Sequence, residues 1–267
     1  MTHFYVTLPS NSSMDYFPEN KTSFFITKLK DRISLTDEWE VGLSEIFIPK
    51  NWHNITPEHV LSFDFADFPS NVENYKFRDS YYSVRPGYYP SLEGLVEELN
   101  ILCTKHALPN DTRPKFFNDR ISSHIHVWIP HNVELNLSPR LASVLGFHKS
   151  SYYNKTHTNG INFYSDKACD VKDGIHSMFV YCDVAECVPV GDTAAPLLKI
   201  INIDGTSHGD TIHRYYDRPS YVPLQKLNFE TLEIHIKDCF NEYIPFQSGT
   251  AIATLHFRRV KASYFSK

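Results

Sequence analysis

The sequence predicts an all-β protein, a single jelly-roll antiparallel β-sandwich with one or two inserted helices. Short apolar runs with a period of two residues recur along the chain, separated by turn residues. These runs do not alternate with helices, which argues against a doubly wound parallel sheet. Aromatic residues make up 14% of the 267 residues, with 19 Phe and 16 Tyr against 3 Met, which favours β structure and contact surfaces. One β-sandwich can fill this length.

The first 21 residues predict an arm. They are rich in Ser, Asn and Pro, yet they carry aromatic side chains, which a flexible linker would lack. We expect residues 1–21 to become ordered by docking onto another surface, with residues 4–20 contacting a neighbouring molecule. The single jelly-roll domain then comprises residues 22–267.

Strand-like segments follow the arm. Between residues 39 and 48 the apolar positions alternate and then slip by one residue, which predicts a β-bulge near Ser44 or Glu45. Pro49 ends that strand. The other strands expected here are 24–29, 60–65 and 75–84, with a turn at 67–71.

A helix-containing insertion is expected at about residues 85–176. After Ser91, a plausible N-cap, apolar residues recur at helical spacing as far as Cys103. A second, shorter helix is expected at 139–145, ended by Gly146. Residues 124–129 alternate as a half-buried strand, and residues 150–176 predict a long loop.

The last third returns to strands. Two of them show an inward and an outward face: Leu232, Ile234 and Ile236 point inward in one, and Ala253, Leu255 and Phe257 in the other. Gly191-Asp192 predicts a turn. The strands expected in this region are 178–184, 197–203, 211–216, 231–238 and 251–260.

Charge and cysteine usage restrict the class of protein. A net charge of −5 argues against a protein that binds nucleic acid over its whole surface. The five cysteines have no regular spacing, which predicts reduced, mostly buried thiols in a reducing compartment. We expect no secretory signal and no membrane span. Without a secretory route, we expect the sequons at Asn11, Asn20, Asn54 and Asn154 to reflect the amino-acid composition and not to be glycosylated.

The best metal candidate is the pair His124 and His126 on one strand face. Two His at this spacing can reach one ion, as in cupins, but the Glu expected four or five residues later is replaced by Pro130 and His131. The alternative is a solvated strand face. The loop 204–210 groups acid, hydroxyl and imidazole residues, which is also the composition of an ordinary turn. We therefore predict a protein that is not an enzyme, with no catalytic, cofactor-binding or metal-binding residues.

Two features predict contact surfaces. The C-terminal residues Arg258, Arg259, Lys261 and Lys267 form a basic tail, which is either a solvated end or a contact for a polyanion such as DNA or for an acidic partner. Tyrosines in or beside loops suit protein interfaces, because they bury area and keep a polar group. They are Tyr81, Tyr82, Tyr88, Tyr89, Tyr152, Tyr153, Tyr215, Tyr216 and Tyr221.

Four collinear segments resemble a known family. They are FYVTLPSNSSMDYFPEN at the start, WEVGLSEIFIP, YCDVAECVPVGDTAAPLLKII, and YVPLQKLNFETLEIHIKD followed by IPFQSGTAIATLHFRR. In this order they are similar to the minor capsid protein, or penton, of Maverick/Polinton elements and the related adintoviruses. The segments carry no catalytic signature.

The resemblance implies a structural role. It implies a single jelly-roll protein that assembles as a homopentamer at the vertices of an icosahedral shell, beside a double jelly-roll major capsid protein. The protein would then be part of the virion, assembled inside the host cell, in the cytoplasm or nucleus. Two other classes stay open: a soluble jelly-roll module that binds carbohydrate or protein, and a cupin-like metalloenzyme.

Overall fold

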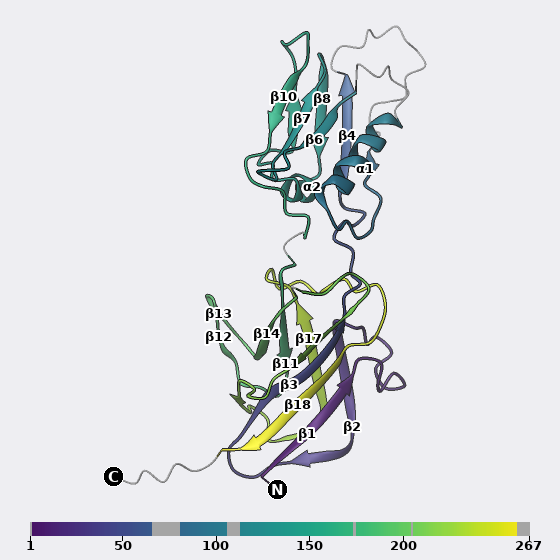
Figure 1. Cartoon of the computed structure of the whole chain (residues 1–267). Helices are drawn as coiled ribbons and strands as arrows, with labels where there is room; N and C mark the ends of the chain where they lie inside the picture. Colours follow the sequence, from purple (N-terminus) through teal and green to yellow (C-terminus); the bar gives the residue numbers. More distant parts are fainter. Residues whose placement is uncertain (1, 66–80, 106–112, 173–174, 204, 261–267) are drawn as a thin grey trace, which may run out of the picture. The chain divides into compact units, whose positions relative to one another are not determined.

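The computed structural model describes residues 2–65, 81–105, 113–172, 175–203 and 205–260 (Figure 1). The chain divides into two compact units. Unit 1 comprises Met1–Trp52 and Gly174–Lys267, and unit 2 comprises His53–Asp173. The inserted unit therefore begins well before residue 85, where we expected it. The apolar strand at 60–65, which we had assigned to the jelly roll, belongs to the core of unit 2.

Unit 1 is a jelly roll. One sheet has the order β1-β18-β3-β15, with β16 also pairing to β3, and the other has the order β14-β11-β17-β2. All pairings are antiparallel, and the strand order is that of two interleaved Greek keys. The strands are β1 (His3–Pro9), β2 (Phe24–Ser34), β3 (Trp39–Pro49), β11 (Ser177–Cys182), β14 (Leu197–Asn202), β15 (Thr211–Tyr215), β16 (Val222–Pro223), β17 (Asn228–Lys237) and β18 (Ile252–Arg259).

The core of unit 1 lies between these two sheets. The inward faces predicted for β17 and β18 are confirmed, since all six of those side chains are fully buried. The predicted bulge is also confirmed. Glu45 pairs with Thr254 and Leu43 pairs with Leu255, so Ser44 is the extra residue. Its hydroxyl donates to the Thr254 carbonyl at 2.9 Å.

The prediction of an N-terminal arm is wrong for its first half. Residues 3–9 form β1, which pairs along its whole length with β18 of the same chain. Leu8 is fully buried, and the ring of Phe4 stacks on Phe257 with centroids 4.8 Å apart. Phe4 and Leu8 therefore complete this chain's own sandwich, whereas Tyr5 on the opposite face of β1 stays 58% exposed.

The second half of the predicted arm covers the edge of β2. The side-chain amide of Asn20 accepts from the Ile26 amide and donates to the Ile26 carbonyl, each at 2.9 Å. Ser13 Oγ accepts from the Lys28 amide at 3.0 Å. These side chains take the place of a neighbouring strand, which protects an exposed sheet edge. Lys28 is the last residue of β2 bound in this way among the residues that the structure describes.

A separate hairpin joins β11 to β14. Its strands are β12 (Val188–Val190) and β13 (Thr193–Ala195), which pair only with each other among the described residues. The turn predicted at Gly191-Asp192 is confirmed, and Gly191 has a φ of +62°. We did not predict the two short strands, because three residues are too few for a period to be recognised.

Unit 2 contains two small sheets and both helices. The sheet orders are β5-β4-β8-β9 and β10-β7-β6. Both helices were predicted, and the hydroxyl of Ser91 caps the first by accepting from Gly94 N. No helix in the described part of the chain is long and apolar enough to cross a membrane. The elements are β4 (Val60–Phe65), β5 (Tyr82–Ser83), α1 (Leu92–Thr104), β6 (Lys115–Asn118), β7 (Ile125–Ile129), β8 (Val133–Leu137), α2 (Pro139–Val144), β9 (Ser151–Tyr153) and β10 (Ile161–Tyr164).

The loop expected at 150–176 is partly wrong, because it contains β9 and β10. Asn162 and Tyr164 of β10 are exposed and alternate with half-buried Ile161 and Phe163. Four residues of this kind are too few to stand out from the polar sequence around them. The turn expected at 67–71 and most of the strand expected at 75–84 lie outside the described residues.

Candidate interaction surfaces

Most of the nine loop tyrosines take part in packing. Tyr152 is buried in the core of unit 2, and Tyr89 is half-buried, with its hydroxyl donating to the Arg85 carbonyl at 2.8 Å. Only Tyr81 and Tyr215 are largely exposed, with 70% and 65% of their surface accessible. Of the nine, Tyr81 and Tyr215 are therefore the ones whose exposure suits a contact surface, and that role stays a prediction.

Other aromatic residues are exposed as well, and of these only Tyr5 and Tyr16 lie in the N-terminal segment where we expected a contact. They lie on the outward faces of strands and in short turns, and only β1 is long enough for alternation along the strand to identify its exposed ring. A sheet face covered by water normally carries polar residues, so exposed rings on it mark a contact surface. The residues are Tyr5, Tyr16, Phe117, Tyr164, Phe240 and Tyr243.

The outer face of the first sheet of unit 1 carries what we call the histidine–tyrosine cluster, which is His3, Tyr5, Tyr221 and His256. The rings of Tyr5 and His256 stack with centroids 4.3 Å apart, and Tyr221 Oη lies 2.7 Å from His256 Nδ1. His256 Nε2 lies 3.3 Å from His3 Nδ1. Burial lowers the pKa of His256, and the neighbouring His3 and Arg258 lower it further. The imidazole of His256 is therefore neutral near pH 7 and accepts a proton only on acidification.

The basic tail is partly neutralised. Arg258 forms an ion pair with Glu40 and lies over the ring of Tyr221, 3.4 Å from its centroid. Arg259 pairs with Asp37 at 2.7 Å. Two of the four cations assigned to a polyanion contact are thus held by acidic side chains of the same unit. Lys261 and Lys267 lie outside the described residues.

The second sheet of unit 1 carries a polar chain on its outer face. Glu233 Oε1 lies 2.8 Å from His235 Nε2, and His235 Nδ1 lies 2.8 Å from Tyr243 Oη. Burial lowers the pKa of His235, while Glu233 opposes the shift, and burial raises the pKa of Tyr243. Because Tyr243 follows the turn after β17 and its hydroxyl meets His235 of that strand, this chain of groups holds the turn in place.

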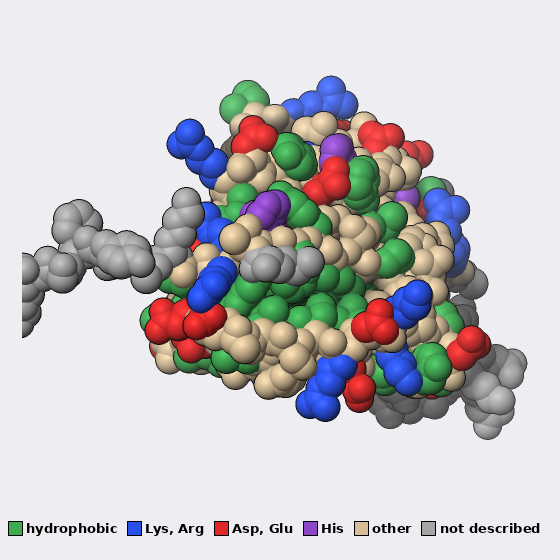
Figure 2. Space-filling model, turned by 90° about the horizontal axis from the view of Figure 1, so that it is seen from below, with side chains coloured by type: hydrophobic (Ala, Val, Ile, Leu, Met, Phe, Trp, Pro, Cys, Tyr) green, Lys and Arg blue, Asp and Glu red, His purple; other side chains and the backbone are tan. Residues whose placement is uncertain are grey.

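One end of unit 1 has an apolar centre. Figure 2 looks at the end where β1 begins and β18 ends, and green apolar side chains gather there inside a ring of charged ones. An apolar centre with a polar rim is typical of a protein contact. Half-buried apolar residues of the core at these strand ends are Phe4, Ile33, Leu35 and Leu227.

Unit 2 carries a row of three rings across the sheet β10-β7-β6. His126 pairs in register with Phe117 on one side and Tyr164 on the other, with ring centroids 4.9 and 5.3 Å away. His124 Nδ1 instead lies 3.1 Å from the Ser165 carbonyl. The two candidate metal ligands thus have separate partners, and no group of three His, Cys, Asp or Glu able to hold a metal occurs in the described residues.

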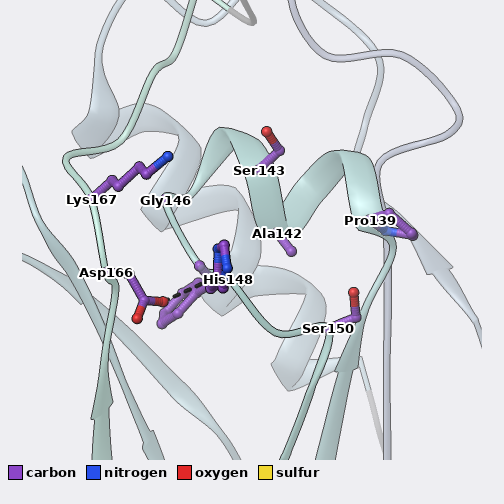
Figure 3. A pocket seen from close by; sticks show the side chains of 9 residues that line it. Pro139, Ala142, Ser143, Gly146, His148, Ser150, Asp166 and Lys167 are labelled. Atoms are coloured by element: carbon purple, nitrogen blue, oxygen red, sulfur yellow. Dashed lines mark hydrogen bonds between the residues drawn. The ribbon is translucent and has the colours of Figure 1, made fainter.

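A small pocket of unit 2 lies between α2 and the segment that includes Asp166 and Lys167 (Figure 3). Its volume is about 260 Å³. Asp166 Oδ2 accepts from the amide of His148 at 2.8 Å, so that carboxylate serves to fix the backbone after α2. The pocket joins few convergent polar groups, in contrast to a typical ligand site.

The loop 204–210 is a turn in the residues described. Asp210 Oδ2 accepts from the amide of Ser207 at 3.0 Å, and both Gly205 and Gly209 have positive φ. Asp204 lies outside the described residues. In the described part of the loop, the Thr206 hydroxyl donates to the Ile203 carbonyl at 3.3 Å, so this hydroxyl and the Asp210 carboxylate are engaged in turn formation.

The five cysteines are free thiols. Burial raises the pKa of three of them, Cys103, Cys169 and Cys182, to about 12, which makes them unreactive near pH 7. Cys187 and Cys239 are exposed, so the expectation of mostly buried thiols applies to part of the set.

Comparison with known proteins finds similarity to solved structures and not to known sequences. No protein-family model matches the chain, and no curated protein sequence does. Among solved structures, the selenomethionine-labelled penton protein of mavirus matches with a TM-score of 0.47 and 11% sequence identity. The match covers 97% of this chain and 100% of that chain. A likeness of this degree assigns no function by itself.

Proposed function

We propose that this protein is a structural capsid protein, a penton that forms the pentameric vertex of an icosahedral shell. The observation that carries the proposal is the jelly-roll strand order of unit 1, which agrees with the fold implied by the four collinear sequence segments. Its role is association and not chemistry. Copies of the chain meet in heterologous contacts that close a ring, and the ring meets a double jelly-roll major capsid protein.

The exposed surfaces supply the material for such contacts. Unit 1 has an apolar end with a charged rim and an aromatic cluster on one sheet face. Buried apolar area and tyrosine anchors are the main source of affinity at protein interfaces. On this proposal the protein is part of the virion and assembles inside the host cell. A contact of the C-terminal tail with DNA would depend on Lys261 and Lys267, since both arginines are paired.

The experiment that tests this proposal is co-expression with the major capsid protein of the same element, followed by electron microscopy. We expect shells with filled vertices, and a pentamer when the mass of the purified protein is measured in solution. Shells whose vertices stay empty while this protein is present and folded would refute the capsid role.

A second candidate function is a jelly-roll module that binds carbohydrate or protein. The row of rings in unit 2 favours this function. Tyr164 is 66% exposed and Phe117 is 43% exposed, and exposed aromatic rings on a sheet face suit contact with a sugar or a protein. A monomer in solution with glycan or protein affinity that Tyr164→Ala abolishes would support this function over the first.

A further inference from the structure

The β12–β13 hairpin is a projecting acidic element. It extends away from both sheets of unit 1 (Figure 1), and none of its residues is fully buried. A lone two-stranded hairpin is marginal in water unless it packs on something. Glu186 at its base and Asp192 at its tip are exposed, and no Lys or Arg occurs between residues 184 and 198. The hairpin therefore presents negative charge.

The edge strand β2 presents positive charge at the opposite side of the same sheet. Lys30 and Arg32 are both exposed, and they follow directly after Lys28, where the side-chain cover of this edge ends. Here β2 also bulges away from β17, because Ile33 pairs with Phe229 but Lys28 pairs with Thr231. Asp31 and Glu230 are the acidic residues of this stretch, so cations remain in excess.

The strand order puts these two features on opposite edges. The hairpin lies in the chain between β11 and β14, at one edge of the order β14-β11-β17-β2, and β2 is the other edge. A ring of identical subunits needs two different, complementary patches on two sides of each subunit. An acidic projection at one edge and an uncovered basic strand at the other meet this requirement.

We infer that the β12–β13 hairpin of one copy docks against the uncovered part of β2 in the next copy. This inference rests on the proposed function and specifies which surfaces close its ring. A second copy of this chain is the occupant that fits the charges, since an acidic hairpin repels nucleic acid and anionic lipid surfaces. Charge pairing also selects head-to-tail contact over hairpin-to-hairpin contact.

A charge-swap experiment tests the inference. We would prepare the full chain as Glu186→Lys with Asp192→Lys, as Lys30→Glu with Arg32→Glu, and with all four changes together. All four side chains are exposed, so each variant should keep the far-UV circular dichroism of the wild type. Glu97→Lys with Lys155→Glu in unit 2 is the matched control, because both residues are exposed and lie outside the hairpin and β2.

The readout is mass in solution by light scattering over a dilution series. We expect each reversed pair to raise the concentration needed for assembly at least 10-fold, the four-fold variant to restore assembly, and the control to behave as the wild type. A wild-type pentamer whose reversed variants also assemble normally, or a swap that fails to restore assembly, would overturn the docking contact and leave the capsid role standing. A wild type that stays monomeric at every concentration would overturn both.

Discussion

At the scale of single residues, three of the four sequon asparagines are structural. Asn154 is almost fully buried, donates to the carbonyls of Ile129 and His157, and accepts from the amide of His157. Asn54 binds the backbone at Tyr89 in the same way, and Asn20 covers the edge of β2. A buried amide that bonds on both sides ties segments together that would otherwise leave polar groups unpaired.

We predict that Asn154→Ala destabilises unit 2 by about 3 kcal/mol, because it leaves buried backbone groups without partners. Asn11→Ala is the matched control. Asn11 belongs to the same kind of sequon but is exposed, so its replacement should change stability by less than about 0.5 kcal/mol. Urea unfolding of both variants checks this, and equal stabilities would contradict the role assigned to Asn154.

A second prediction concerns the buried His59. Its Nδ1 accepts from the Thr56 amide at 3.0 Å, and burial lowers its pKa from 6.5 to about 4. The unfolded chain therefore binds a proton more readily than the folded one. The contribution of His59 to the free energy of unfolding is therefore fully present above pH 6.5. It is lost as the pH falls towards 4, by about 3 kcal/mol for this one group.

Urea unfolding at pH 7 and at pH 4.5 measures this dependence. His59→Gln should reduce the loss on acidification, whereas His148→Gln, at an exposed histidine of the same unit, should leave it unchanged. An unaltered pH dependence in His59→Gln would show that other groups cause it.

At the scale of elements, the sequence predicted the long periodic segments well. Helix α1, the bulge at Ser44 and the inward faces of β17 and β18 all follow from apolar spacing, which the structure confirms. Strands of three or four residues, such as β9, β10, β12 and β13, could not be predicted. Their conformation is set by the neighbours they pair with, and those neighbours are distant in the sequence.

We predict that Gly160→Ala disrupts the face of unit 2 that holds the ring row. Gly160 has a φ of +81°, and a Cβ there would lie 2.3 Å from Trp128 Nε1. Gly205→Ala is the control, since Gly205 has a φ of +82° but open space around it. The control should cost about 1–2 kcal/mol from backbone strain alone, and Gly160→Ala about 2 kcal/mol more.

Denaturant unfolding together with tryptophan fluorescence measures the difference. Trp128 must move to admit the methyl group, so the emission spectrum should change in Gly160→Ala and not in Gly205→Ala. Equal losses of stability in the two variants would mean that Trp128 moves aside without a measurable cost in free energy.

At the scale of the whole molecule, the two units have separate cores. The buried residues of unit 1 and of unit 2 form two clusters that share no residue. We predict that replacing residues 53–173 with a flexible Gly/Ser linker leaves a folded jelly roll. Circular dichroism and amide hydrogen exchange would check this, with slow exchange expected in β3, β17 and β18. Loss of all slow exchange would show that unit 1 depends on unit 2.

The sequence predicted a jelly roll with an insertion but misplaced two of its boundaries. The first half of the predicted arm was wrong because β1 pairs with β18, and nothing local in residues 1–21 indicates so distant a partner. The start of the insertion was wrong because strand 60–65 has the same periodicity in either unit. Candidate surfaces were predicted from composition, whereas their location depends on which strand faces turn outward.

The pairing of β1 with β18 has a consequence for synthesis. Thr7 and Thr254 lie 3.2 Å apart across this pair but 247 residues apart in the chain. A ribosome therefore exposes β1 long before β18 exists, and the first sheet cannot close until residues 10–251 between them have been translated. Prematurely terminated products would lack the strand between β1 and β3, so such fragments should be recognised by chaperones and proteases before they could join an assembly.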